Sequence, residues 1–180
     1  MSKSVSTAVA EKSEHSSQPA ASRRAEALAE RLEQGARMLA DFATTLTDAE
    51  WKTRLPKDSR KIGTIVHHVA SQYMLEIKVA LMVVSGQPIT GLTNADVDAV
   101  NAAHAKEFEN ATKAQALELL AQNSADAAAT IRGLADEELD RAVPNSLYED
   151  APITCQMVLE DHAVRHSYHH LWIIRKFLGR

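Results

Sequence analysis

Apolar side chains recur at every third or fourth position in four stretches of the chain, which is the period of an α-helix with one buried face. The pattern begins at Arg23 and is interrupted by polar segments. No stretch alternates apolar and polar residues between turn signals, so no strand is expected. The apolar positions are, in chain order, Leu28, Leu32, Ala36, Leu39 and Phe42; Ile62, Ile65, Val66, Val69, Tyr73, Ile77, Ala80 and Val84; Ala116, Leu117, Leu120, Ala127 and Ile131; and Leu159, Ala163, Ile173 and Phe177. Four amphipathic helices without a sheet predict an all-α four-helix bundle.

The ends of these helices follow from capping and helix-breaking residues. The second helix ends at SGQP, where Gly86 and Pro88 are stop signals. Thr154 is a suitable N-cap for the last helix, which is predicted over residues 155–178. The remaining elements expected are a long helix at about 113–134, a short helix at about 96–107, one or two turns within 136–143, and a loop at about 144–154.

The N-terminal segment, residues 1–21, differs in composition from the rest of the chain. It contains Ser, Ala, Glu and Lys with one Pro and few bulky apolar side chains. Such a segment cannot bury enough apolar surface to offset the entropy lost on ordering, so a disordered tail is expected. Residues 22–180 are expected to form one domain, which is long enough to bury a hydrophobic core.

Charge and cysteine content narrow the class of protein. The formal net charge of −4 argues against a nucleic-acid-binding protein, which usually carries a basic face. No run of about 18 apolar residues is present, so no membrane span is expected. The single cysteine, Cys155, excludes an internal disulfide, and we expect a cytoplasmic protein in which Cys155 is a small buried side chain rather than a nucleophile.

The chain has eight histidines, and four of them fall between positions 162 and 170. On a helical wheel, His166 lies at the centre of the apolar face of the last helix and His170 lies beside it. Their i, i+4 spacing lets both rings reach one point, as two metal ligands on a helix do. His68 of the second helix can face the same interior and supply a third ligand. A divalent metal held by His68, His166 and His170, with one position open, is therefore predicted.

The other histidines are assigned lesser roles. His162 and His169 are expected to be supporting or surface residues, and His67 and His104 are expected to face water. The alternative for any one of the inward-facing histidines is a core side chain that is satisfied by a single hydrogen bond.

A carboxylate and a few polar residues complete the set of candidates. Glu76 lies two turns after His68, near the apolar stripe, which is an unusual place for a carboxylate. It either orients an imidazole or accepts a proton, or else it is a solvated or ion-paired side chain. Asn101 and Tyr148 are candidates to line a pocket, whereas Tyr73 is expected to pack in the core.

Four short stretches resemble a known family. They are SRKIGTIVHHVAS in the second helix, DVDAVNAAHAKEF in the middle segment, GLADEEL after the third helix, and DHAVRHSYHHLWIIRKFLG near the C-terminus. In this order and at these separations they are similar to the DinB-like superfamily, over about residues 25–179. The chain departs from the pattern after its double histidine, where relatives often carry Arg-Gly-Gln and this sequence has Leu171, Trp172 and Ile173.

The resemblance implies a bundle with up-down-down-up topology, a divalent metal on three histidines, and a homodimer. Position by position, the implied ligands are His68, His166 and His170. Characterised relatives include S-transferases that use a low-molecular-weight thiol, such as mycothiol, bacillithiol or glutathione, and a thiol-dependent maleylpyruvate isomerase.

The hypothesis that follows is a metal-dependent S-transferase that joins a low-molecular-weight thiol to an electrophilic small molecule. Coordination to a metal deprotonates a thiol, and the same metal could instead activate water for hydrolysis. The sequence is also compatible with a bundle that binds metal or a small ligand without turnover, and with a purely structural bundle. Zinc is the ion expected first, and nickel or another divalent ion also suits imidazole ligands.

Overall fold

The computed structural model describes residues 22–56 and 59–180, and the tail expected at residues 1–21 lies outside the described residues. Helices dominate the described part of the chain, as the apolar periodicity predicts. The elements are α1 (Arg23–Thr44), α2 (Asp48–Lys52), α3 (Ile62–Val84), α4 (Asn94–Glu107), α5 (Lys113–Arg132), α6 (Asp136–Asp140), β1 (Ala142–Asn145), β2 (Ala151–Thr154), α7 (Cys155–Val158) and α8 (Arg165–Leu178).

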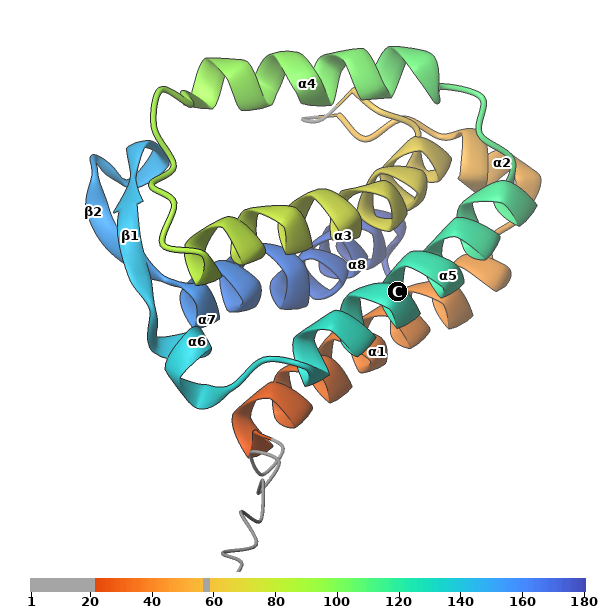
Figure 1. Ribbon diagram of the computed structural model, residues 1–180. Helices are drawn as coiled ribbons and strands as arrows, with labels where there is room; N and C mark the ends of the chain where they lie inside the picture. Colours follow the sequence, from red (N-terminus) through yellow and green to blue (C-terminus); the bar gives the residue numbers. More distant parts are fainter. Residues whose placement is uncertain (1–21, 57–58) are drawn as a thin grey trace, which may run out of the picture.

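Four long helical segments pack into a bundle, which confirms the predicted fold class. Figure 1 shows α1 and the α7–α8 segment running in one direction and α3 and α5 running in the opposite one, so the order is up-down-down-up. Consecutive long helices that run parallel need a connection as long as the bundle. The 14 residues of α4 rise about 21 Å, and this helix makes the return crossing between α3 and α5.

The core lies between α1, α3, α5 and the last helix. It contains the side chains that the periodic pattern places on the inner faces, and Tyr73 is fully buried among them, as expected. The largest fully buried side chains include Leu32, Leu39, Ile62, Ile65, Tyr73, Leu120, Ile131, Leu159 and Ile174. Burial of these side chains is the main stabilising contribution to the fold.

One expectation from the sequence is wrong, because residues 142–154 form a β-hairpin rather than a loop. Strands β1 and β2 are antiparallel, with Val143 opposite Ile153 and Pro144 opposite Pro152. The backbone of Ile89, in the connection from α3 to α4, donates to the Pro144 carbonyl oxygen at 3.0 Å. This bond ties the hairpin to the segment that joins α3 to α4.

The last helix is continuous but irregular. Thr154 caps its start, since its hydroxyl accepts a hydrogen bond from the Met157 amide at 3.1 Å, as predicted. Residues Leu159–Val164 then form a π-helical segment before regular α-helix resumes at Arg165. A π-helical turn holds an extra residue, so it changes which side chains share a face, and such turns are frequent at functional sites.

In the described part of the chain, no helix combines the length and the apolar character that crossing a bilayer would require.

Candidate metal centre

Three histidines from two helices meet inside the bundle, and they are the three that the sequence predicts. His68 lies on α3, and His166 and His170 lie one turn apart on α8. One ring nitrogen of each lies within 4.8 Å of the other two. The Nε2 atoms of His68 and His166 are 3.3 Å apart. Two imidazoles bound to a tetrahedral zinc ion would place their nitrogens about 3.3 Å apart, so this spacing suits a metal.

The chemistry of the three side chains also fits a cation. His68 and His170 are buried, and the Nδ1 atom of each has no hydrogen-bond partner among the described residues. Burial, followed by proximity to His166, lowers the pKa of both His68 and His170 to about 2. Both rings are therefore neutral at physiological pH, which is the form that binds a metal.

Glu76 contacts His166, which agrees with one role that the sequence left open for this carboxylate, that of orienting an imidazole. Its Oε1 lies 2.5 Å from His166 Nδ1, so the imidazole donates its Nδ1 hydrogen to the carboxylate and leaves the Nε2 lone pair directed at His68. The second oxygen, Oε2, is buried and has no partner in the described part of the chain. A carboxylate that orients a ligating imidazole in this way fixes its tautomer and raises its basicity.

His162 lies in the π-helical segment, one turn before His166. Tyr148, from the hairpin loop, donates to Asp161 Oδ2 at 2.9 Å, and its hydroxyl oxygen lies 3.2 Å from His162 Nε2. Burial, with the hydrogen bond to Asp161 next, raises the pKa of Tyr148 to about 12. His162 thus contacts Tyr148 and is not one of the three described histidines whose ring nitrogens converge.

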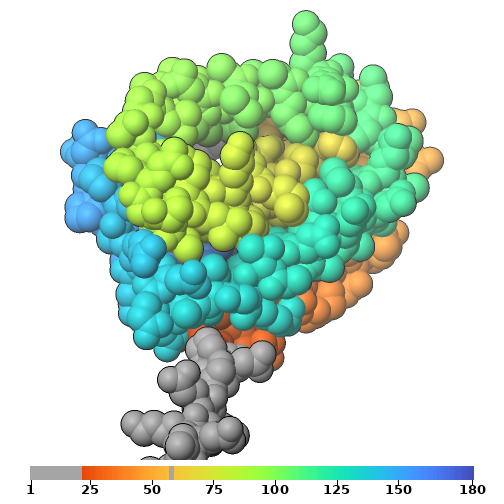
Figure 2. All heavy atoms as spheres, viewed as in Figure 1, coloured from red at the N-terminus to blue at the C-terminus, as the bar shows by residue number. Residues whose placement is uncertain are grey.

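A cavity of about 600 Å³ adjoins the three histidines. Much of its wall is apolar, and Asn101 and Tyr148 line it, as the sequence suggests. Figure 2 shows a hollow between α4 and α3 on this face of the molecule. Helix α4 covers the cavity with Asn94, Val97 and Asn101, while the hairpin contributes Asn145 and Leu147.

Two histidines that were expected to face water do not. His67 is buried, its ring stacks on Phe108 at a centroid distance of 4.1 Å, and its Nδ1 lies 3.1 Å from His104 Nε2. His104 is half-buried and its Nε2 also lies 3.1 Å from the Ser71 hydroxyl. The helical wheel of α3 is misleading here because α4 covers the face that a simple bundle would leave in water.

Two other candidates are placed where the sequence predicts. His169 is exposed, and its ring packs beside that of His170 with 5.3 Å between centroids. Cys155 is fully buried, and burial raises the pKa of its thiol to about 11, so it is not a nucleophile.

Several lining residues were not identified from the sequence. Arg60, Gln72, Asn94 and Asn145 all contribute to the cavity wall. The only signal for Arg60 is its place just before the second helix, and Asn145 lies in a segment that was predicted to be a loop. The hairpin and α4 bring these residues together in the wall of one cavity.

Comparison with known proteins agrees with this architecture. The chain is similar to the solved structure of YfiT from Bacillus subtilis, which is described as a probable metal-dependent hydrolase with an unusual four-helix bundle topology. The TM-score is 0.70 at 19% sequence identity, over 92% of this chain and 94% of that one. At this identity the likeness shows a shared fold, and a comparison with curated proteins gave no match. The family model of the DinB superfamily matches residues 31–174, and the chain therefore belongs to the DinB superfamily.

Proposed function

We propose that this protein is a metal-dependent enzyme in which His68, His166 and His170 hold a divalent ion, with zinc expected first and nickel second. The proposal rests on the position of the three imidazole rings. Their nitrogens converge in the wall of a cavity of about 600 Å³ and not in the closed core. Three protein ligands beside an open space are the arrangement of a catalytic metal site rather than a structural one.

The reaction proposed is transfer of a low-molecular-weight thiol to an electrophilic small molecule. A divalent ion supplies Lewis acidity, which lowers the pKa of a thiol or a water molecule bound to it. Glu76 keeps the Nε2 lone pair of His166 directed at His68 by accepting a hydrogen bond from Nδ1. We assign Glu76, whose other oxygen Oε2 has no hydrogen-bond partner among the described residues, as the acceptor of the proton that the nucleophile gives up.

The cavity supports a small organic substrate. A volume of about 600 Å³ lies within the range of sites for small molecules. Its apolar lining side chains, among them Val79, Leu92 and Val97, favour a substrate with an apolar part.

Metal-dependent hydrolysis is the second candidate. It is favoured by the similarity to YfiT, described as a probable metal-dependent hydrolase, and the same Glu76 would then accept the proton of water. The third candidate is a bundle that binds metal or a small ligand without turnover.

Metal analysis of protein purified without chelator tests the metal centre. We expect one divalent ion per chain in the wild type, and loss of most of it in His68→Ala, His166→Ala and His170→Ala. The matched control is His169→Ala, which removes an exposed histidine next to the site and should retain the ion. Metal content near zero in the wild type, or unchanged in the three variants, would overturn the proposal.

The choice between transfer and hydrolysis needs a separate assay. Metal-loaded protein is incubated with each candidate thiol and a panel of electrophiles, and free thiol is measured over time. Consumption of thiol that depends on His68 supports the transferase. Product release from ester or amide substrates without any thiol supports the hydrolase, and activity with neither leaves the binding protein as the better description.

The resemblance also implies a homodimer, which stays a prediction. Sedimentation velocity at micromolar concentration should give a species of twice the 19.7 kDa chain mass, and a single monomeric boundary would contradict it.

A further inference from the structure

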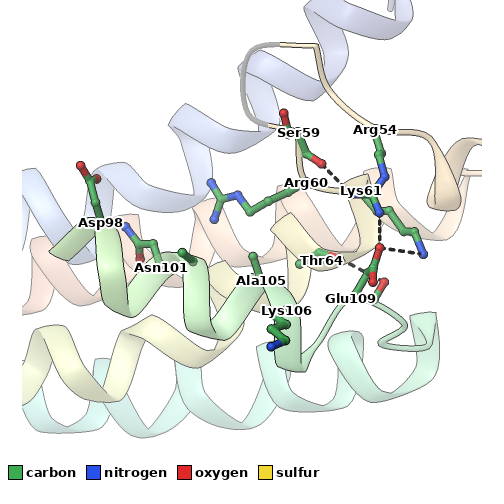
Figure 3. A pocket seen from close by; sticks show the side chains of 11 residues that line it. Arg54, Ser59, Arg60, Lys61, Thr64, Asp98, Asn101, Ala105, Lys106 and Glu109 are labelled. Atoms are coloured by element: carbon green, nitrogen blue, oxygen red, sulfur yellow. Dashed lines mark hydrogen bonds and ion pairs between the residues drawn. The ribbon is translucent and has the colours of Figure 1, made fainter. Parts of the chain in front are cut away.

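A second cavity, of about 560 Å³, lies next to the metal-site cavity, and two residues line both. These are Arg60, just before α3, and Asn101 of α4. Figure 3 shows the Arg60 side chain extending towards the helix that carries Asn101. The two residues therefore stand at the boundary between the cavities.

Arg54 and Lys61, which also line the second cavity, lie beside a carboxylate. Glu109 pairs with Arg54 and lies 3.7 Å from the Lys61 ammonium group. Lys61 also donates to Asn110 Oδ1 at 2.9 Å. Arg54 and Lys61 line the second cavity, and neither lines the cavity beside the histidines.

Arg60 lines the same cavity as the three histidines. Arg60 therefore borders the same space as the proposed ligands.

The charged side chains around the cavity next to the histidines favour an anionic ligand once a divalent ion is bound. Among the described residues, the side chains that line it and carry a formal charge at neutral pH are Arg60 and Glu76. Glu76 already accepts a hydrogen bond from His166 and balances the charge of Arg60. A divalent ion on the three neutral histidines leaves the wall positively charged, and an anionic ligand would neutralise it.

We propose that this cavity takes a small carboxylate with an apolar body, whose carboxylate group is bound by Arg60 and Asn101. The planar guanidinium group matches a carboxylate, and the Asn101 amide can donate a further hydrogen bond. The apolar body packs against Val79, Leu92 and Val97. This assignment of substrate class rests on the proposed function, because it places the reacting molecule in the cavity beside the metal ligands.

The proposal is tested by calorimetric titration with 3-phenylpropanoate and with the neutral 3-phenylpropanamide, which has nearly the same shape. The titrations use zinc-loaded and chelator-treated protein. Zinc-loaded wild-type protein should bind the carboxylate about tenfold or more tightly than the amide, since a charge-assisted pair contributes about this much. Chelator-treated protein should keep a smaller preference, because the formal charges of Arg60 and Glu76 cancel there. Arg60→Gln should remove the preference, and Arg60→Lys should restore part of it.

Arg54→Gln is the matched control, because Arg54 lines the second cavity and not the cavity beside the histidines. This variant should behave as wild type. Thermal melting of each variant shows that the comparison is made on folded protein. Equal affinity for the two compounds in wild type, no binding of either, or a preference that survives Arg60→Gln would overturn the proposal.

The two forms of the protein separate this inference from the proposed function. A preference seen only in zinc-loaded protein and retained in Arg60→Gln means that the metal binds the carboxylate, which rejects the role of Arg60 and leaves the metal centre intact. A preference that depends on Arg60 in a protein that binds no metal supports the role of Arg60 and rejects the proposed metal centre.

Discussion

The imidazole of His166 has a different partner on each ring nitrogen. Nδ1 lies 2.5 Å from the Glu76 carboxylate, and Nε2 lies 3.3 Å from Nε2 of His68. Because the carboxylate accepts a hydrogen bond from Nδ1, the hydrogen stays on Nδ1 and the Nε2 lone pair is available to bind a cation. The position of Glu76 on α3, two turns beyond His68, therefore decides how a residue on another helix presents its lone pair.

Replacement of Glu76 tests this arrangement. Glu76→Gln should weaken zinc affinity about 10- to 100-fold, because the neutral amide is a poorer acceptor and raises the basicity of the imidazole less. The measurement is a competition titration with a chromogenic chelator. Glu118→Gln removes an exposed carboxylate and serves as the control, and equal affinities of the two variants would contradict the role of Glu76.

Because His68 and His170 are buried, we expect the folding stability of the metal-free protein to decrease in acid. Their pKa values are lowered from 6.5 to about 2, so between these values the unfolded chain binds protons at both residues and the folded chain does not. Stability must therefore fall as the pH drops below about 6.5, by up to about 1.4 kcal/mol per pH unit for each histidine.

Urea unfolding in chelator at pH 6.5, 6.0 and 5.5 measures this slope. His170→Gln removes one titrating group, so the slope should be smaller by up to about 1.4 kcal/mol per pH unit than in wild type. The same slope in both proteins would show that His170 is not buried in its neutral form.

The three proposed ligands could be predicted from the sequence because each lies on or beside an apolar stripe, and the stripes of α3 and α8 face each other in any bundle. His67 and His104 could not be placed, since their burial depends on how α4 lies over α3. Arg60 was missed for a related reason. Nothing in the local pattern shows that the segment before α3 borders a cavity.

Among the elements, α4 is the least firmly packed. None of its residues is fully buried in the described structure. A side-chain link to α3 comes from His104, whose Nε2 contacts both His67 and Ser71 at 3.1 Å. Because no side chain of α4 is fully buried, we expect this helix to open more readily than the long helices of the core.

Substitution of His104 should loosen this helix. His104→Ala is expected to increase amide hydrogen exchange across α4 several-fold and to leave α1 and α5 unchanged, as measured by mass spectrometry. Val100→Ala, at a side chain that is 53% exposed on the same helix, should have a much smaller effect. Unchanged exchange in His104→Ala would mean that other contacts hold α4.

The contact between α2 and α3 depends on a glycine. A Cβ atom at Gly63 would lie 2.3 Å from Nε1 of Trp51, whose indole also donates to the Ala111 carbonyl oxygen at 3.0 Å. Gly63→Ala should therefore destabilise the protein by about 1–3 kcal/mol in urea unfolding. Gly133→Ala, where the nearest atom would be 3.3 Å away, should cost far less, and similar losses in both variants would contradict this explanation.

The long helices were predictable from apolar period, capping residues and helix breakers, since these are local properties. The hairpin was not, because its strands hold only four residues each and include Pro144 and Pro152. Its loop also turns at Glu149 and Asp150, both in the left-handed region, without the glycine that usually marks such a turn. The π-helical segment has no sequence signal of its own.

In the whole molecule, the proposed ion would join α3 to α8, which are far apart in the sequence. Binding to the folded state alone at about 100 times the dissociation constant contributes about 2.7 kcal/mol. For a protein of this length that raises the melting temperature by roughly 5–10 °C. Differential scanning fluorimetry with and without zinc should show this rise in wild type and in His169→Ala, and no rise in His170→Ala. A shift that persists in His170→Ala would point to a different zinc site.

Because α4 crosses over the bundle, most residues that line the cavity from above are separate from the residues that stabilise the core. The proposed ligands lie on helices that also form the core, so substitutions around them act on folding and on metal affinity together. Helix α4, which covers the cavity, has no fully buried residue. We therefore expect substitutions at its cavity-lining positions, such as Val97 and Asn101, to leave the packing of the four long helices unchanged. A chain built this way can acquire a new substrate while its stability stays constant, which makes α4 the natural segment to randomise in directed evolution.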